Sequence, residues 1–212
     1  MHQRLMEFLA DPHDQGPLTL HTFEGQNENT RDGILLNEKT GRWYVIEDGI
    51  PTLFIDPLRP DDSRFAKRFR GRLEALGCAK GASEEEKGAD LVRIESERRA
   101  RDEQAEDYDR MWTMKLLGLA EVPAYKSALS DNLTTPLLEA GAGTGRLTGI
   151  FAEIAPEVVA VDMSRDSLLR NRVRHLGRTR HPVLWLHADL TNLPLKDGAF
   201  GPPLRGRAAR DP

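Results

Sequence analysis

The chain has 212 residues and a formal net charge of −4, an acidic balance that gives no reason to expect a nucleic-acid surface. Cys78 is the only cysteine, which excludes an internal disulfide and a thiolate-rich zinc site and is compatible with a reducing cytosol. Because no apolar stretch is long enough for a signal peptide or a membrane span, the sequence predicts a cytoplasmic protein.

Residues 1–56 are predicted to form a small β-rich unit. An apolar cluster at the start suggests a short helix that ends before Asp11. The runs LTLHTF, GILLNE, RWYVIE and PTLF are predicted strands, and the turn signals between them are Gly25, Gly33, Gly41 and the pair Asp48–Gly49. A unit of about 55 residues has a thin core, so we expect it to pack on the rest of the chain.

The segments LMEFLADPHDQGPLTL and DGILLNEKTGRWYVIEDGIPTLF resemble the small zinc-ribbon-like domain that accompanies or activates some methyltransferases. That family has cysteine knuckles. Asp11 and Asp14 stand at the positions of the first knuckle, and the second knuckle would fall near Asn37 and Thr40. Structural zinc prefers thiolate and imidazole ligands, and His13 beside two aspartates is a poor substitute. We therefore expect a unit without metal.

Residues 57–118 are predicted to be a helical linker region. Its basic run carries Phe65, Phe69 and Leu73 at helical spacing. In an acidic chain this pattern favours a solvated helix with one apolar stripe over a nucleic-acid patch. The run KGASEEEKGAD that follows is typical of an exposed linker.

A second, highly charged helix is predicted between residues 91 and 117. The stretch ERRARDEQAEDYDRMW within it resembles the helix that leads into the core of many methyltransferases, where an aromatic residue can approach the cofactor. Tyr108 is therefore a candidate lid residue, and plain packing on the domain that follows is the alternative.

Residues 135–162, within a predicted domain over residues 119–200, tie several residue types to one chemical task. An apolar run ends in Glu139, a glycine loop follows, and a helical pattern leads to a second apolar run that ends in Asp162. In an open parallel sheet, ligands bind outside the carboxyl ends of the strands, so the loop and both acids should converge on one crevice. The pattern predicts an α/β fold with a nucleotide-type site.

Two familiar glycine loops fit this stretch poorly. A phosphate-binding P-loop needs four residues between its glycines and then Lys-Ser/Thr, which is absent. A dinucleotide loop needs its third glycine three positions after the second, and that position is Arg146.

The segment EAGAGTGRLT closely resembles the first motif of class I S-adenosylmethionine-dependent methyltransferases, and the resemblance continues through VVAVDMSRDSLL and VLWLHADLTNLPLKDGAF. It implies the first three strands of a Rossmann-like sheet, S-adenosylmethionine as cofactor, and methyl transfer to a small-molecule or macromolecular acceptor. The cofactor-binding residues that it implies are Glu139, Gly141, Gly143, Gly145, Asp162, Met163, Asp189 and Leu190.

The resemblance gives each of these residues a role. The glycines let the backbone approach the methionine part of the cofactor, where Glu139 would help to hold the amino-acid end. Asp162 would accept from both ribose hydroxyls. Asp189 would accept from the adenine amino group, with Met163 and Leu190 flanking the ring.

Local structural roles are the alternatives for the same residues. Asp162 could cap the helix that starts near Ser164, and Asp189 could open a turn. His187 is expected to be a strand residue with a hydrogen-bonded imidazole rather than a base.

The family has seven strands in its core, and this chain carries signals for three. The segment GPPLRGRAARDP, residues 201–212, is predicted to be an irregular tail because its prolines and arginines do not suit a central strand. We therefore expect half a cofactor site, most of the acceptor site missing, and an apolar sheet edge at LLEAG that invites self-association. The alternatives to an enzyme are a non-catalytic cofactor-binding or interaction module that uses residues 1–56 as its surface, or an inactive fragment.

Overall fold

A computed structural model of the chain describes residues 1–78 and 133–200. The candidate lid residue Tyr108, the predicted linker beyond residue 78 and the predicted tail 201–212 lie outside the described residues. Within the described part of the chain, no helix is long and apolar enough to cross a membrane.

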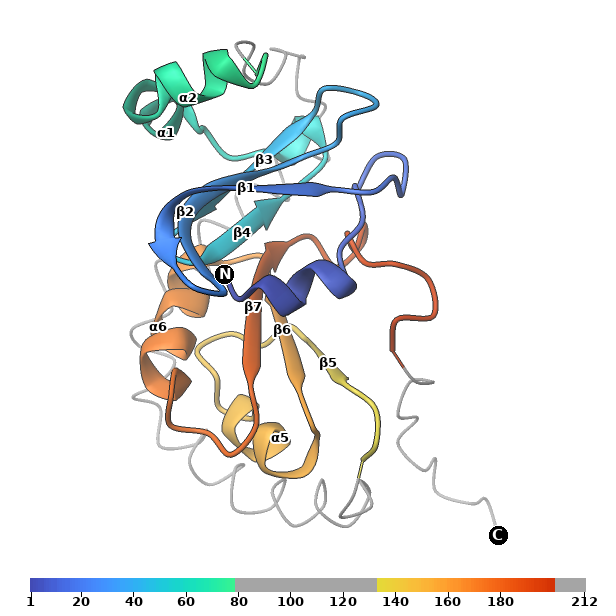
Figure 1. The fold of residues 1–212 in the computed structure, drawn as a ribbon. Helices are drawn as coiled ribbons and strands as arrows, with labels where there is room; N and C mark the ends of the chain where they lie inside the picture. Colours follow the sequence, from blue (N-terminus) through green and yellow to red (C-terminus); the bar gives the residue numbers. More distant parts are fainter. Residues whose placement is uncertain (79–132, 201–212) are drawn as a thin grey trace, which may run out of the picture.

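The described residues share one seven-stranded sheet with the strand order β1-β2-β3-β4-β7-β6-β5 (Figure 1). Its strands are β1 (Thr19–Gln26), β2 (Asn29–Leu36), β3 (Trp43–Glu47), β4 (Ile50–Leu53), β5 (Leu137–Ala140), β6 (Val158–Asp162) and β7 (Val183–Ala188). The helices are α1 (Ser63–Arg68), α2 (Arg70–Ala75), α5 (Thr148–Ile154) and α6 (Arg165–His175), with 3-10 helices η1 (Gln3–Glu7) and η2 (Asp56–Leu58).

Strands β5, β6 and β7 are parallel and lie in the order β7-β6-β5. Leu137 pairs with Val158, which in turn pairs with Val183, so the three strands end at the same edge of the sheet. All five residues of β6 are buried, as is typical of a parallel strand covered on both faces. The α/β fold class and the first three strands of a Rossmann-like sheet are thereby confirmed.

The four N-terminal strands extend this sheet. Strands β1 to β4 are antiparallel neighbours, and β4 then pairs in parallel with β7 through Thr52 opposite His187 and Leu53 opposite Ala188. The β-rich unit and the parallel strands are therefore continuous in one sheet. The domain boundary at residue 56 stays a prediction.

Both parts of the chain contribute to one apolar cluster on the face of the sheet that η1 covers. Its members include Leu5, Leu9, Leu35, Tyr44, Ile46, Leu53, Val159, Val161, Leu184 and Leu186. Burial of these side chains supplies the main stabilisation that a thin N-terminal core lacks. The expectation that residues 1–56 pack on the rest of the chain is confirmed.

The opposite face is covered by helices at both ends. Helices α5 and α6 pack on β5 to β7, and α1 and α2 pack on the N-terminal strands. Phe65, Phe69 and Leu73 are buried against Phe23, which confirms the predicted apolar stripe. Arg68 of α1 forms ion pairs with carboxylates of β1 and β2.

Gly33 was predicted to be a turn residue because glycine favours turns, and this prediction is wrong. It lies inside β2, and the chain reverses at Asn27, whose φ is 53°. A Cβ at Gly33 would lie 2.4 Å from the backbone oxygen of His21 on the neighbouring strand. The register between β1 and β2 shifts close by, between Thr22 and Glu24, so the glycine permits a close approach of two strands at an irregularity.

The two turns that resemble knuckles are joined by hydrogen bonds. The Asn37 amide nitrogen donates to Asp11 Oδ2 at 2.8 Å and to Asp14 Oδ1 at 3.1 Å. The Tyr44 hydroxyl donates to Asp11 Oδ1 at 2.8 Å, and the backbone N–H groups of Lys39 and Thr40 donate to Asn37 Oδ1. Asp11 and Asn37 are fully buried, so side-chain hydrogen bonds tie one turn to the other.

Candidate functional site

The glycine loop follows β5 and lies at the carboxyl edge of the parallel strands. Gly141, Gly143 and Gly145 have φ values of 73°, 52° and 90°, which side chains rarely adopt. The space beside them differs. Among the described residues, a Cβ at Gly143 would meet no atom within 4 Å and one at Gly141 would meet only Leu190 at 4.0 Å, whereas one at Gly145 would lie 2.7 Å from Asn171. The first two glycines therefore have space beside their backbone that no other described residue fills.

Asp162 joins the end of β6 to this loop. Its buried carboxylate accepts from the Gly143 backbone N–H at Oδ2 and from the Ser164 backbone N–H at Oδ1, each at 2.8 Å. Ser164, not Asp162, caps α6, because its hydroxyl accepts from the Ser167 N–H. A carboxylate has about four acceptor positions, so both oxygens can accept further hydrogen bonds from a ligand.

Glu139 is the penultimate residue of β5 and is buried. The Thr148 hydroxyl donates to Glu139 Oε2 at 2.6 Å. Burial raises the pKa of this carboxyl group to about 7, since desolvation and the neighbouring Asp162 charge outweigh the Thr148 hydrogen bond and the more distant Arg146. Near neutral pH the group can accept a cationic partner as a carboxylate or hold a proton.

Asp189 follows β7 and opens a turn, as its local alternative predicted. The Thr191 backbone N–H donates to Oδ1 at 2.9 Å and the Thr191 hydroxyl to Oδ2 at 2.6 Å. Next to it, Leu190 is 41% exposed and lies beside Gly141. The turn role and a ligand role are compatible, because the carboxylate retains acceptor positions.

The comparisons with known proteins concern this same part of the chain. Residues 138–201 match the family model described as a methyltransferase domain. This stretch of the chain is therefore similar to a methyltransferase domain, in agreement with the motifs that resemble class I S-adenosylmethionine-dependent methyltransferases. It contains every residue that the sequence placed at the cofactor, from Glu139 to Leu190, and S-adenosylmethionine is the cofactor of its class.

Among solved structures, the chain is similar to phosphoethanolamine N-methyltransferase 1 of Haemonchus contortus, whose structure is a complex with phosphoethanolamine and S-adenosylhomocysteine. The identity is 22% and the TM-score is 0.41. The match covers 48% of this chain and 22% of the length of that enzyme's chain. No curated protein matches the sequence.

A hydrogen-bonded network behind the loop of the methyltransferase domain was not predicted from the sequence. Asn171 of α6 is fully buried, and its amide nitrogen donates to Thr148 Oγ1 at 2.9 Å and weakly to Gly143 O at 3.4 Å. The Trp185 indole N–H donates to Asn171 Oδ1 at 3.0 Å. The side-chain amide of Asn171 thus connects the glycine loop, Thr148 of α5 and Trp185 of β7.

His175, one turn further along α6, holds the loop as well. Its Nε2 lies 2.8 Å from the Gly145 carbonyl oxygen, and because a carbonyl can only accept, the ring donates. Burial lowers the pKa of His175, which favours the neutral ring. Neither Asn171 nor His175 carries a local sequence signal, since each acts on a loop 28 or 30 residues away.

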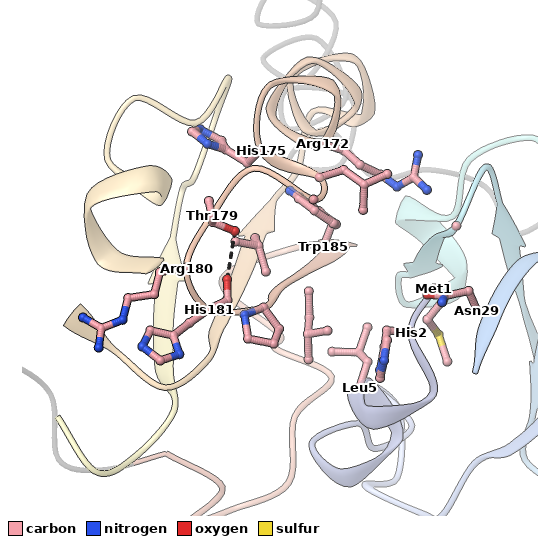
Figure 2. Close-up of a pocket in the computed structure, with 16 residues that line it drawn as sticks. Met1, His2, Leu5, Asn29, Arg172, His175, Thr179, Arg180, His181 and Trp185 are labelled. Carbon is pink, nitrogen blue, oxygen red and sulfur yellow. Dashed lines mark hydrogen bonds between the residues drawn. The ribbon is translucent and has the colours of Figure 1, made fainter. Parts of the chain in front are cut away.

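A cavity of about 300 Å³ lies elsewhere, between the N-terminal segment, α6 and the start of β7 (Figure 2). Arg172 extends from α6 toward the side that Met1 and Asn29 line, and its guanidinium lies 5.9 Å from the Trp185 ring centroid. None of the sequence-predicted cofactor residues lines this cavity.

Proposed function

We propose that this chain binds S-adenosylmethionine at the carboxyl edge of β5, β6 and β7 and transfers its methyl group to an acceptor, either a small molecule or a macromolecule. The backbone beside Gly141 and Gly143 supplies open space for the methionine part of the cofactor. Glu139 supplies a negative charge for the amino-acid end. The carboxylate of Asp162 accepts from the ribose hydroxyls.

The residues that follow β6 and β7 would bind the adenine end of the cofactor. Met163 and Leu190 would provide apolar surface on either side of a planar ring, and the partial exposure of Leu190 supports this role. Asp189 retains acceptor positions for the exocyclic amino group beyond its turn contacts.

The bound sulfonium makes its methyl carbon electrophilic, so the protein's task is to align the acceptor and exclude water. The loop contributes through rigidity. Asn171 and His175 hold its carbonyl groups from behind, and Asp162 holds the Gly143 N–H in front.

One observation supports the proposal most directly. The acid that would bind the ribose and the loop that would bind the methionine part are bonded to each other, with Gly143 N 2.8 Å from Asp162 Oδ2. Open space adjoins this contact at Gly143. Fixed polar groups beside a backbone face that no described side chain covers support a ligand site here.

Isothermal titration with S-adenosylmethionine and S-adenosylhomocysteine tests the proposal. Loss of a hydrogen bond to a charged group costs about 1.5–3 kcal/mol, so Asp162→Ala should weaken binding by roughly ten- to a hundredfold. Asp166→Ala, which removes an exposed carboxylate four residues further on, is the matched control and should bind like the wild type.

Two results would count against the proposal. A folded wild-type protein that binds neither ligand contradicts it outright. Binding without production of S-adenosylhomocysteine across amine, hydroxyl and thiol acceptors would favour the cofactor-binding module over the enzyme.

A further inference from the structure

The segment that carries the ribose acid is contacted by the N-terminal strands. Asp162 is the last residue of β6, Met163 and Ser164 link it to α6, and Arg165 is the first residue of that helix. Two sets of polar contacts reach the link from the N-terminal strands. In the first, Thr52 of β4 acts through one histidine, and in the second the partners lie at the turn between β3 and β4.

The first contact runs through His187 of β7. Its Nε2 lies 3.1 Å from the backbone oxygen of Met163, and its Nδ1 lies 3.0 Å from the Thr52 hydroxyl. A carbonyl oxygen can only accept, so Nε2 carries the hydrogen. In the neutral ring Nδ1 is then the acceptor and the Thr52 hydroxyl is the donor, which fixes both the tautomer and the orientation of the imidazole.

The His187 ring has little freedom to leave this position. Its side chain is buried, and the Phe54 ring packs edge-on against it with 4.7 Å between ring centroids. Thr52 lies directly opposite His187 in the β4–β7 pairing, so the hydroxyl is positioned by the sheet itself.

The second contact is made by Arg165. Its guanidinium donates to Asp48 Oδ2 at 3.0 Å and to the backbone oxygen of Glu47 at 3.3 Å, and it lies 3.5 Å from the Glu47 carboxylate. Glu47 ends β3 and Asp48 lies in the turn that leads to β4, so both partners belong to the N-terminal strands.

Between these two contacts there is space rather than close packing. A cavity of about 370 Å³ is lined by Thr52, His187, Arg165 and Phe65 of α1, among others. Within the described residues, the two polar contacts are therefore what connects the N-terminal strands to the Met163 link across this cavity.

We propose that the N-terminal strands position the cofactor-binding link, with Thr52 and His187 as positioning residues for Met163 and Arg165 as a second support for the start of α6. The inference rests on the proposed function of that link. It assigns a task to residues 1–56: they act on S-adenosylmethionine affinity through the backbone of residues 162–165, without touching the cofactor.

Thr52→Val removes the hydroxyl and keeps the shape of the side chain, and Thr52→Ser restores the hydroxyl. Because the valine leaves a buried imidazole nitrogen without its donor, we expect Thr52→Val to weaken binding of S-adenosylhomocysteine and of 5′-methylthioadenosine about five- to twentyfold. Thr52→Ser should bind within about twofold of the wild type. Thr22→Val, which removes a hydroxyl contact with Thr30 far from the link, should leave binding unchanged.

The second support is tested in the same way. Arg165→Met should weaken both ligands, and Arg165→Lys should recover part of the loss because a lysine can still reach Asp48. Thermal unfolding of each variant shows whether it is folded at the titration temperature. Wild-type affinity in folded Thr52→Val and Arg165→Met would overturn the inference.

Nitrogen NMR of the histidine rings separates this inference from the proposed function. The wild type should show His187 with hydrogen on Nε2, and Thr52→Val should shift the Met163 backbone amide signal. If the protein binds no cofactor, the proposed function fails while these signals still test the support. Hydrogen on Nδ1, or a Met163 signal insensitive to Thr52→Val, would refute the positioning role.

Discussion

At the scale of single residues, the ionisation of Glu139 should make stability depend on pH. Its pKa is raised from an ordinary 4.5 to about 7 by burial. A pKa that is higher in the folded state adds stability at low pH, and that contribution is lost as the pH rises through the folded value. The protein should therefore lose up to about 3 kcal/mol from this group between pH 4.5 and 8.

Glu139→Gln removes the titrating group and retains an oxygen for the Thr148 hydroxyl. The difference in free energy of unfolding between wild type and variant should shift in favour of Glu139→Gln from pH 5 to pH 8. Urea unfolding at several pH values measures it, with Glu153→Gln on the exposed side of α5 as a control for charge removal. A difference that stays constant with pH would contradict the prediction.

Single residues also show which features of the site can be predicted from local sequence patterns. Glu139, Asp162 and Asp189 were placed correctly at the ends of strands because strand ends carry strong local signals of apolar runs, acids and turns. Gly33 was wrongly predicted to be a turn residue, since a glycine in a sequence indicates only that a side chain is disfavoured at that position. Whether the reason is a positive φ or a neighbouring strand depends on tertiary structure.

At the scale of elements, two glycines of the loop should affect different properties, one cofactor binding and the other the stability of the fold. Gly143 and Gly145 both have positive φ, but only Gly145 faces an atom at a distance that forbids a Cβ. Gly145→Ala should therefore destabilise the protein strongly, by roughly 3 kcal/mol or more, through its clash with Asn171. Gly143→Ala should cost about 1 kcal/mol of backbone strain and yet weaken S-adenosylmethionine binding by more than about tenfold, because its methyl group fills the open face.

Gly177→Ala is a matched control for this pair. Gly177 follows α6 with a φ of 68°, and a Cβ there would meet no atom within 4 Å, so the variant carries the same strain away from the loop. Its stability loss should equal that of Gly143→Ala, and its affinity should equal that of the wild type. Urea unfolding and titration calorimetry give both quantities. Undiminished affinity in Gly143→Ala would show that the cofactor does not approach this backbone.

The support for the loop could not be predicted from the sequence for a physical reason. Asn171 and His175 lie on α6 and bond to the loop, and Trp185 of β7 bonds to Asn171. These contacts form only when α6 packs on the sheet. In the sequence, Asn171 is a polar residue in a charged helix. Its burial gives it a role, and burial of a polar side chain depends on the packing of the whole domain.

At the scale of the whole molecule, the sheet joins two parts of the chain that local patterns treated as separate. The pairing of Thr52 with His187 and of Leu53 with Ala188 links residues 135 positions apart. Strand signals in PTLF and VLWLHA predicted both strands, but strand signals do not specify partners. The thin N-terminal core gave the one physical hint, since a unit that cannot bury enough apolar surface must share a core with something else.

The described sheet ends at β5, and this edge leads to a prediction about association. The Leu137 N–H donates to Glu157 O and the Gly141 N–H to Val161 O, so alternate residues face β6. Leu138 and Ala140 therefore direct their backbone groups outward, where no described strand pairs with them. An edge that no described strand covers favours pairing with a second copy, so the apparent mass in solution should rise with protein concentration.

Ala140→Lys tests this, because Ala140 is exposed and a lysine on an edge strand opposes pairing by charge and solvation. Size-exclusion chromatography with light scattering should show the variant as a monomer at concentrations where the wild type associates. Thr135→Lys adds the same charge just before β5 and should associate like the wild type, since it leaves the outward backbone groups uncovered. If Ala140→Lys associates as strongly as the wild type, contact between copies must form at another surface, because pairing along β5 would place this lysine inside the new ladder.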